Sequence, residues 1–251
     1  AVGSAGSAVL VAQTILLPLL LTNNKSHLVL EGGTHTHHAP SFDYFSKVYL
    51  PLINQMGPKV KTQIDRYGFY PAGGGKFEIF IQPTEKLTKI NLLTKGKCLK
   101  QNAEVIISQL PRDIAIRELK VIATELLLDD EKFIIKEALS PGPGNFVQVE
   151  YCYSNVTELF TGIGTKGVPA EEVAIAVVKD IQKYLATEVP VGPHLANQLL
   201  LPMAITGKGS FRTMNPTIHT RTTIETIKHF LPIDIIVKEE DDNCWLITIV
   251  S

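Results

Sequence analysis

The sequence is poor in cysteine, and its glycine and proline contents are ordinary. Its 251 residues include only 3 cysteines, Cys98, Cys152 and Cys244, an odd number spaced far apart. Such a set makes neither a disulfide framework nor a paired-cysteine metal site, and it favours a reducing, cytoplasmic environment. With 18 glycines and 15 prolines, collagen-like and low-complexity chains are excluded.

Charge of one sign is not in excess either. The chain has 24 Lys and Arg against 25 Asp and Glu, a formal net charge of −1. Proteins that wrap long nucleic acids usually carry a basic excess, so we expect no DNA-wrapping surface. A local basic patch could still bind the end of a nucleic acid or a small anion. Because 45% of the residues are hydrophobic, the chain is not disordered and can bury a core.

Long hydrophobic runs are also missing. The longest, residues 8–21, contains Gln13 and Pro18 and is shorter than the roughly 20 residues that a membrane-spanning helix needs. The residues before it lack the basic start of a signal peptide. We therefore expect a buried helix that Pro18 kinks or ends, and no membrane segment.

The hydrophobic pattern divides the chain into three parts. In residues 1–94, apolar spacing predicts a helix at 40–56, and the alternating segment KFEIFIQ at 76–82 predicts a half-buried strand. The pattern of predicted strands and helices changes at about residue 95. We therefore predict that residues 95–187 form a separate α/β module inserted into the parent domain. Residues 188–251 return to the first pattern, with helices predicted at 193–204 and 222–231 and a closing hairpin. Two similar units around one insert predict an internally repeated α/β architecture.

The segment THTHH at residues 34–38 holds three of the seven histidines. In an extended loop, His35 and His37 would share a face while His38 points away, and no Cys or carboxylate stands at a diagnostic spacing. A polar loop that faces a substrate is therefore favoured over a zinc site. A zinc-dependent hydrolase remains the alternative, and elemental analysis would test it.

Two further histidines lie near predicted helix starts. His219 is placed just before a helix, with Thr217 and Thr220 on either side. The free N–H groups of a helix start suit an anion, and unprotonated imidazole has a lone pair that can attack phosphorus. His194 and Gln198 are four residues apart on one helix face, so both can reach one ligand. The simpler interpretation of both segments is N-terminal capping.

Taken together, several segments resemble the RNA 3′-terminal phosphate cyclases. They are residues 3–7 with Gln13, residues 31–34 followed by Ala39 and Pro40, residues 66–75, VGPHLANQLLLPM at 191–203 and TIHT at 217–220. The similarity runs through the whole chain, and GFYPAGGG at 68–75 and TIHT are quite specific. The resemblance implies an α/β (α+β) fold of repeated β-α-β-α-β-β units, like the C-terminal domain of a bacterial translation initiation factor, with an inserted smaller α/β domain. The repeat domain would comprise residues 1–94 and 188–251, and the insert residues 95–187.

The resemblance also implies a ligase-type enzyme. In this family a histidine attacks the α-phosphorus of ATP, AMP passes from the histidine to the RNA 3′-terminal phosphate, and the vicinal 2′-hydroxyl closes a 2′,3′-cyclic phosphate. Carried over by motif, His219 is the nucleophile. The nucleotide pocket is lined by Gln13, Pro40, His194, Leu195, Ala196, Asn197 and Gln198, with Pro40 and His194 on opposite faces of the adenine. ATP and Mg²⁺ are the expected cofactors and an RNA 3′-phosphate end the expected partner, whereas the oligomeric state stays undetermined.

The chain departs from the family pattern in two ways. Some relatives have tyrosine at the position of His194 and aspartate at that of Asn197, which bears on nucleotide affinity and selectivity. The chain also starts without Met, and the family's N-terminal region, with a metal-binding glutamate and RNA-binding arginines, has no counterpart here. We therefore expect a truncated chain that keeps the nucleophile but lacks part of the metal and RNA site. Because relatives that only assist ribosome assembly lack the histidine, a non-catalytic ribosome-biogenesis factor is the alternative function.

Overall fold

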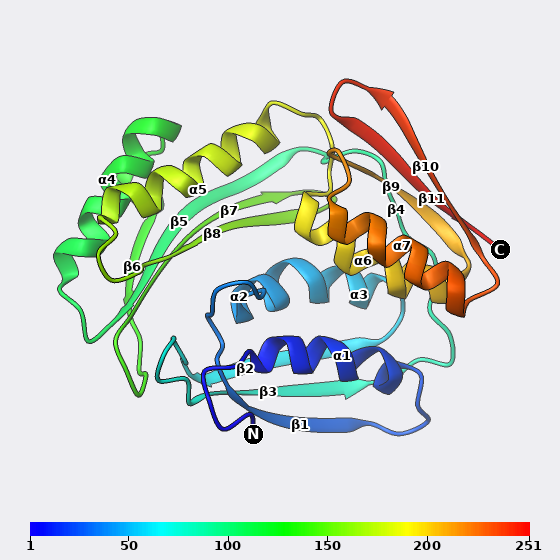
Figure 1. Ribbon diagram of the computed structural model, residues 1–251, viewed down its shortest axis with the longest axis horizontal. Coiled ribbons are helices and arrows are strands. Elements are labelled where there is room, and N and C mark those ends of the chain that lie inside the picture. Colours follow the sequence, from blue (N-terminus) through cyan, green and yellow to red (C-terminus); the bar gives the residue numbers. More distant parts are fainter.

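The computed structural model describes the backbone of residues 1–251 and the side chains of all of them except residue 130. Three sheets organise the chain, with most helices on their inner sides (Figure 1). Two of the sheets belong to similar units at the two ends of the sequence, and the third belongs to the segment between them.

The first unit is built from residues 8–82. It contains α1 (Ala8–Leu20), β1 (Ser26–Gly32), a helical segment made of α2 (Phe42–Tyr44), the π-helical η1 (Phe45–Tyr49) and α3 (Leu50–Gln55), and then β2 (Lys59–Arg66) and β3 (Gly75–Gln82). The strands form an antiparallel sheet in the order β1-β3-β2. The alternation predicted for residues 76–82 is confirmed, because Phe77, Ile79 and Ile81 are buried while Phe80 and Gln82 are exposed.

The second unit follows a related order. It contains β4 (Asn91–Leu92), α6 (Pro193–Thr206), β9 (Lys208–Thr213), α7 (Ile218–Phe230), β10 (Asp234–Asp241) and β11 (Cys244–Val250). Its sheet order is β10-β11-β9-β4, with β4 parallel to β9. Single parallel bridges, Ser7 to Gly33 and Val191 to Thr213, stand just before the first helix of each unit. The repeated α/β architecture predicted from the sequence is therefore confirmed.

The segment between the units forms its own layer. It contains β5 (Cys98–Ser108), α4 (Arg112–Leu126), η2 (Asp130–Lys132), β6 (Phe133–Glu137), β7 (Gly144–Tyr153), β8 (Thr157–Ile163) and α5 (Ala170–Leu185). The sheet order is β6-β5-β7-β8, and α4 and α5 cover one face of it while the other face turns toward α2 (Figure 1). A hydrophobic cluster within residues 103–181 lies under these two helices. The exact domain boundaries at residues 95 and 187 stay a prediction.

A larger hydrophobic cluster runs through both repeated units. It includes Phe45 and Ile53 from the first unit and Leu199 from α6, each with 0% of its surface exposed. Burial of a side chain of this size contributes about 1.5–3 kcal/mol, so the two units are held together by apolar packing. This shared core fixes α6 against the first unit.

The start of α7 differs from the expectation. The helix begins at Ile218 and not at residue 222, because the side chain of Thr217 caps it by accepting a hydrogen bond from the Thr220 N–H at 3.2 Å. Burial of Thr220, Ile224 and Ile227 outweighs the low helix propensity of the threonines. His219 therefore lies within the first turn of the helix rather than before it.

Among the described residues, no helix combines the length and the apolar character that a bilayer span requires.

Candidate active site

The first element of the site is the N-terminus of α6. Gly192 is the N-cap and Pro193 occupies the first position, where its missing N–H costs no intrahelical hydrogen bond. His194 follows and is exposed. The first backbone bond of the helix runs from the Ala196 N–H to the Gly192 carbonyl at 3.0 Å. The N–H groups of His194 and Leu195 therefore have no intrahelical acceptor and suit an anion.

Leu195 and Ala196 differ from the other predicted pocket residues. Their side chains are 0% and 1% exposed and belong to the core. Only their backbone groups can therefore meet a ligand, whereas the side chains of Asn197 and Gln198 are partly exposed.

The second element is the N-terminus of α7. Thr217 is its N-cap, and the Thr217 and Thr220 hydroxyls lie 3.0 Å apart. His219 is exposed at the second helical position, which is the position that His194 occupies in α6. Each of the two helices thus presents one exposed histidine in its first turn.

A hydrogen bond joins the two helices. The hydroxyl of Thr223 donates to Oδ1 of Asn197 at 2.7 Å. Both residues lie in the second turn of their helices, so α6 and α7 run parallel and begin at the same end (Figure 1). The positive ends of two helix dipoles therefore meet beside His194 and His219, which suits a polyanion such as a triphosphate.

The amide side chains of the site leave groups free for a ligand. Because Oδ1 of Asn197 accepts from Thr223, the two N–H donors of this amide remain available. Oε1 of Gln198 is buried and, among the described residues, has no hydrogen-bond partner. Because Oε1 of Gln198 is shielded from solvent, the free polar groups that a nucleotide could reach here are the N–H donors of Asn197.

Gln13 and Pro40 lie in the first unit. Gln13 is partly exposed on α1, and Pro40 is half-buried in the connection that leads to the Ser41 cap of α2. No hydrogen bond between described side chains links either residue to α6 or α7. The structure thus joins Asn197 to α7 directly, and it places Gln13 and Pro40 on separate elements.

His35 has a structural role. Its ring is 0% exposed, with Nδ1 2.8 Å from the Thr34 hydroxyl and Nε2 3.0 Å from the Asp43 carboxylate. The Thr34 hydroxyl oxygen also accepts the Gly68 N–H at 2.9 Å, so this residue joins the His35 ring to the chain at Gly68. Burial acts to raise the pKa of Asp43, but His35 and Lys47 outweigh it and hold this pKa well below its usual range.

The expectation that His35 and His37 share a face is wrong. His37 is exposed and lies 3.3 Å from the hydroxyl of Thr165, because the chain turns after the buried His35. Among the residues that the structure describes, no group of three or more His, Cys, Asp or Glu side chains is gathered that could hold a metal ion. The loop therefore gives no support to a zinc centre.

One residue near the site was not singled out from the sequence. It is Glu158 on β8, whose carboxyl group accepts the Gly192 N–H at 2.7 Å. The available signal for Glu158 was a carboxyl group within a strand of mostly uncharged residues. Its partner could not be inferred because it lies in another unit.

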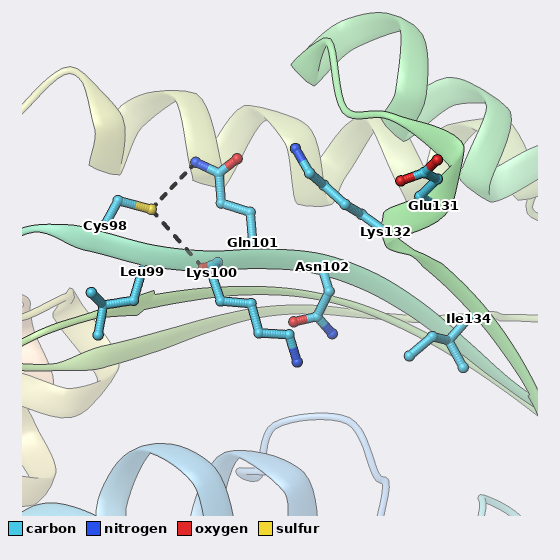
Figure 2. Close-up of a pocket in the computed structure, with 8 residues that line it drawn as sticks. All are labelled: Cys98, Leu99, Lys100, Gln101, Asn102, Glu131, Lys132 and Ile134. Atoms are coloured by element: carbon cyan, nitrogen blue, oxygen red, sulfur yellow. Dashed lines mark hydrogen bonds between the residues drawn. The ribbon is translucent and has the colours of Figure 1, made fainter.

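Two surface hollows lie elsewhere, along β5 of the inserted module. One, of about 450 Å³, surrounds the start of β5, and a second, of about 440 Å³, lies near the end of the same strand. Figure 2 shows Cys98 and Gln101 on one side of β5 and Lys100 and Asn102 on the other. Neither hollow is lined by a residue predicted for the nucleotide pocket.

The fold and the paired helix starts define an α/β protein built from two similar units around an inserted α/β module. The chain belongs to the RNA 3′-terminal phosphate cyclase family, whose model matches residues 1–237. It is 47% identical over 245 residues to the RNA 3′-terminal phosphate cyclase of Koribacter versatilis, covering 97% of this chain and 69% of that protein. It is 36% identical over 233 residues to the protein of the same name from Salmonella typhimurium, covering 93% of this chain and 68% of that protein.

Proposed function

We propose that this protein converts an RNA 3′-terminal phosphate into a 2′,3′-cyclic phosphate in an ATP-dependent reaction, with His219 as the nucleophile. Family membership supports the reaction. The observation that carries the role of His219 is its exposed place in the first turn of α7, next to the parallel start of α6. The free cysteines support a cytoplasmic location.

The proposed reaction has three balanced steps. An imidazole nitrogen of His219 forms a bond to the α-phosphorus of ATP, and the bond to the leaving pyrophosphate breaks. An oxygen of the RNA 3′-phosphate then attacks this phosphorus, which breaks the phosphorus–nitrogen bond and forms an RNA–AMP anhydride. The 2′-hydroxyl loses its proton and attacks the activated 3′-phosphate, so that the cyclic phosphate forms and AMP leaves.

The nucleotide would be held at the paired helix starts. The N–H groups of His194 and Leu195 bind phosphate oxygens, and the two amides, Asn197 and Gln198, contact polar groups of the nucleotide. In the proposal the base lies between Pro40 and the ring of His194, with Gln13 at the edge of the pocket. Stacking on such a ring is worth about 1 kcal/mol or more for a base.

Mg²⁺ is the proposed partner of the ATP triphosphate, whose charge it neutralises when bound. Among the described residues, no group of three or more His, Cys, Asp or Glu side chains is gathered at one place, so the phosphate oxygens of ATP would supply most of the ligands of this ion. We assign no step to a metal ion held by these residues.

Intact mass after incubation with ATP and Mg²⁺ tests the proposal. The chain, and a fusion that carries the N-terminal region of the Koribacter versatilis relative, are compared with their His219→Ala variants. His229→Ala serves as the matched control, because His229 is exposed in the last turn of the same helix. We expect an acid-labile adduct of one AMP that disappears only with His219→Ala.

The outcomes are distinct. An adduct in the fusion alone would mean that the nucleophile is present and that the added region is required. An adduct that survives His219→Ala would assign the nucleophile to another residue. Absence of an adduct from both proteins would contradict the proposal and favour a non-catalytic ribosome-biogenesis role.

A further inference from the structure

One carboxyl group of the inserted module reaches the start of α6. Glu158 lies on β8, is 3% exposed, and accepts the Gly192 N–H through Oε1 at 2.7 Å. The contact is close enough that a Cβ on Gly192 would lie 2.9 Å from the same oxygen. Glycine at the N-cap of α6 is thus matched to the position of this carboxyl group.

The surroundings of Glu158 are tied together by polar contacts. Lys95 Nζ donates to the Thr187 carbonyl at 2.5 Å and lies 4.1 Å from the centre of the Tyr184 ring. The Tyr184 hydroxyl donates to the Pro190 carbonyl at 3.0 Å. The two chain connections between the inserted module and the second unit are therefore held to each other, and the second of them leads into Gly192.

These contacts determine where the first turn of α6 lies. Gly192 is the N-cap, and the next residues carry the N–H groups and the His194 ring that face a ligand. A buried acceptor at an N-cap N–H fixes the direction in which the chain enters the helix, and a bound ligand must then meet the helix in that orientation.

We infer that Glu158 is a positioning residue through which the inserted module orients the nucleotide-binding start of α6. Its effect on the nucleotide rests on the proposed function, whereas its effect on the order of α6 does not. The inserted module is then part of the machinery that shapes the nucleotide site, although it supplies none of the residues predicted to touch the nucleotide.

Hydrogen exchange of residues 191–198 tests the effect on α6. We expect Glu158→Ala to speed exchange of this segment about tenfold, as loss of one buried hydrogen bond would, and Glu158→Gln to stay near the unmodified protein because its amide oxygen still accepts. Glu118→Ala is the matched control. Glu118 is also a buried acidic residue of the inserted module, but its partner is Asn145, whose side-chain N–H donates to it at 2.9 Å.

Unchanged exchange in Glu158→Ala, or an equal increase in Glu118→Ala, would overturn the inference. If Glu158→Ala does not fold, Gly192→Ala supplies the second test, since its methyl group would push against the Glu158 carboxyl group. It should speed exchange of the same segment, and exchange like that of the unmodified protein would again overturn the inference.

The ATP dependence of adduct formation separates positioning from a general loss of structure. Glu158→Ala should raise the half-saturating ATP concentration about tenfold and leave the rate at saturating ATP within about twofold, and Glu158→Gln should restore the original value. A lower rate at saturation with unchanged half-saturation would contradict this. If the unmodified protein and the fusion form no adduct, the proposed function fails, and hydrogen exchange alone still decides whether Glu158 positions α6.

Discussion

The hydroxyl of Thr223 donates to the amide oxygen of Asn197 at 2.7 Å, and this bond ties α7 to α6. Asn197 thereby acts as the acceptor toward α7. Its amide also carries two N–H donors that a carboxylate would lack. One side chain thus pairs the two helices and still offers donors to a ligand.

Replacing Thr223 tests the pairing of the two helices. Thr223→Val keeps the shape of the side chain, removes the donor and leaves the Asn197 oxygen without its partner, so unfolding free energy should fall by about 1 kcal/mol. Urea denaturation measures the change. Thr222→Val is the control, since Thr222 is exposed on the same helix, and equal stability of the two variants would contradict a role for the bond.

The parts of the fold that follow from local patterns were predictable. The alternation of residues 76–82 predicted β3, because strand side chains point to opposite faces and only one face of this sheet is buried. The start of α7 was missed, because intrinsic propensity disfavours a threonine-rich first turn. The cap at Thr217 and the burial of Thr220 depend on the folded chain.

In the site, too, the features set by local sequence were predictable and those that depend on the folded chain were not. The Gly-Pro-His sequence at residues 192–194 predicted a helix start with His194 in the first turn, because the preference of proline for this position is local. The contact between Glu158 and Gly192 joins the inserted module to the second unit. A contact between segments so far apart in the chain produces no pattern that could be recognised in the sequence. The burial of His35 likewise depends on Gly68 and Asp43, which only the fold brings to it.

Lys47 is predicted to contribute more to stability than an ordinary surface lysine. Its Nζ lies 3.3 Å from a carboxylate oxygen of Asp43, 3.7 Å from one of Glu104 and 3.5 Å from one of Glu150, which joins η1 to the sheet of the inserted module. Lys47→Met would leave these three mostly buried carboxylates without their shared cation. We expect the free energy of unfolding to fall by an amount on the order of 2 kcal/mol. This is less than the loss on breaking a fully buried ion pair, because 34% of the Lys47 side chain is exposed.

The control for Lys47 is Lys183→Met. Lys183 pairs with Asp180 at 3.0 Å on the surface, where such pairs contribute about 0–1 kcal/mol. Denaturation at low salt measures both variants. Losses of the same size would show that the carboxylates around Lys47 need no shared cation.

Stability should fall as pH rises through the neutral range, because of Glu158. Burial raises the pKa of Glu158 from its ordinary 4.5 to about 8, and the backbone hydrogen bonds and Lys95 only partly oppose this rise. The folded protein then holds a proton that the unfolded chain has already released, so stability is lost between about pH 4.5 and 8. Glu158 in turn adds to the effect of burial in raising the pKa of Tyr44, Tyr153 and Tyr184.

Glu158→Gln isolates this titration. At about 1.4 kcal/mol per pKa unit, the full effect is on the order of a few kcal/mol, and the variant should lose stability less steeply between pH 5 and 8. Glu118→Gln is the comparison, because burial raises the pKa of Glu118 to about 7 and its contribution ends at lower pH. Denaturation at several pH values gives the slopes, and an unchanged slope above pH 7 in Glu158→Gln would contradict the assignment.

Gly73 is predicted to be intolerant of a side chain. Its φ is +62°, and a Cβ there would lie 2.5 Å from the Ser4 carbonyl oxygen, in the segment that leads into α1. Gly167 is the matched control, since its φ is +89° but a Cβ there would meet nothing within 4 Å. Gly167→Ala should therefore lower the free energy of unfolding by only about 1–2 kcal/mol, which is the cost of a left-handed backbone conformation for alanine. Gly73→Ala should lower it clearly more, because backbone atoms must also move. Urea denaturation compares the two. If both variants lost the same stability, the close approach of residues 73 and 4 would not be a constraint on the fold.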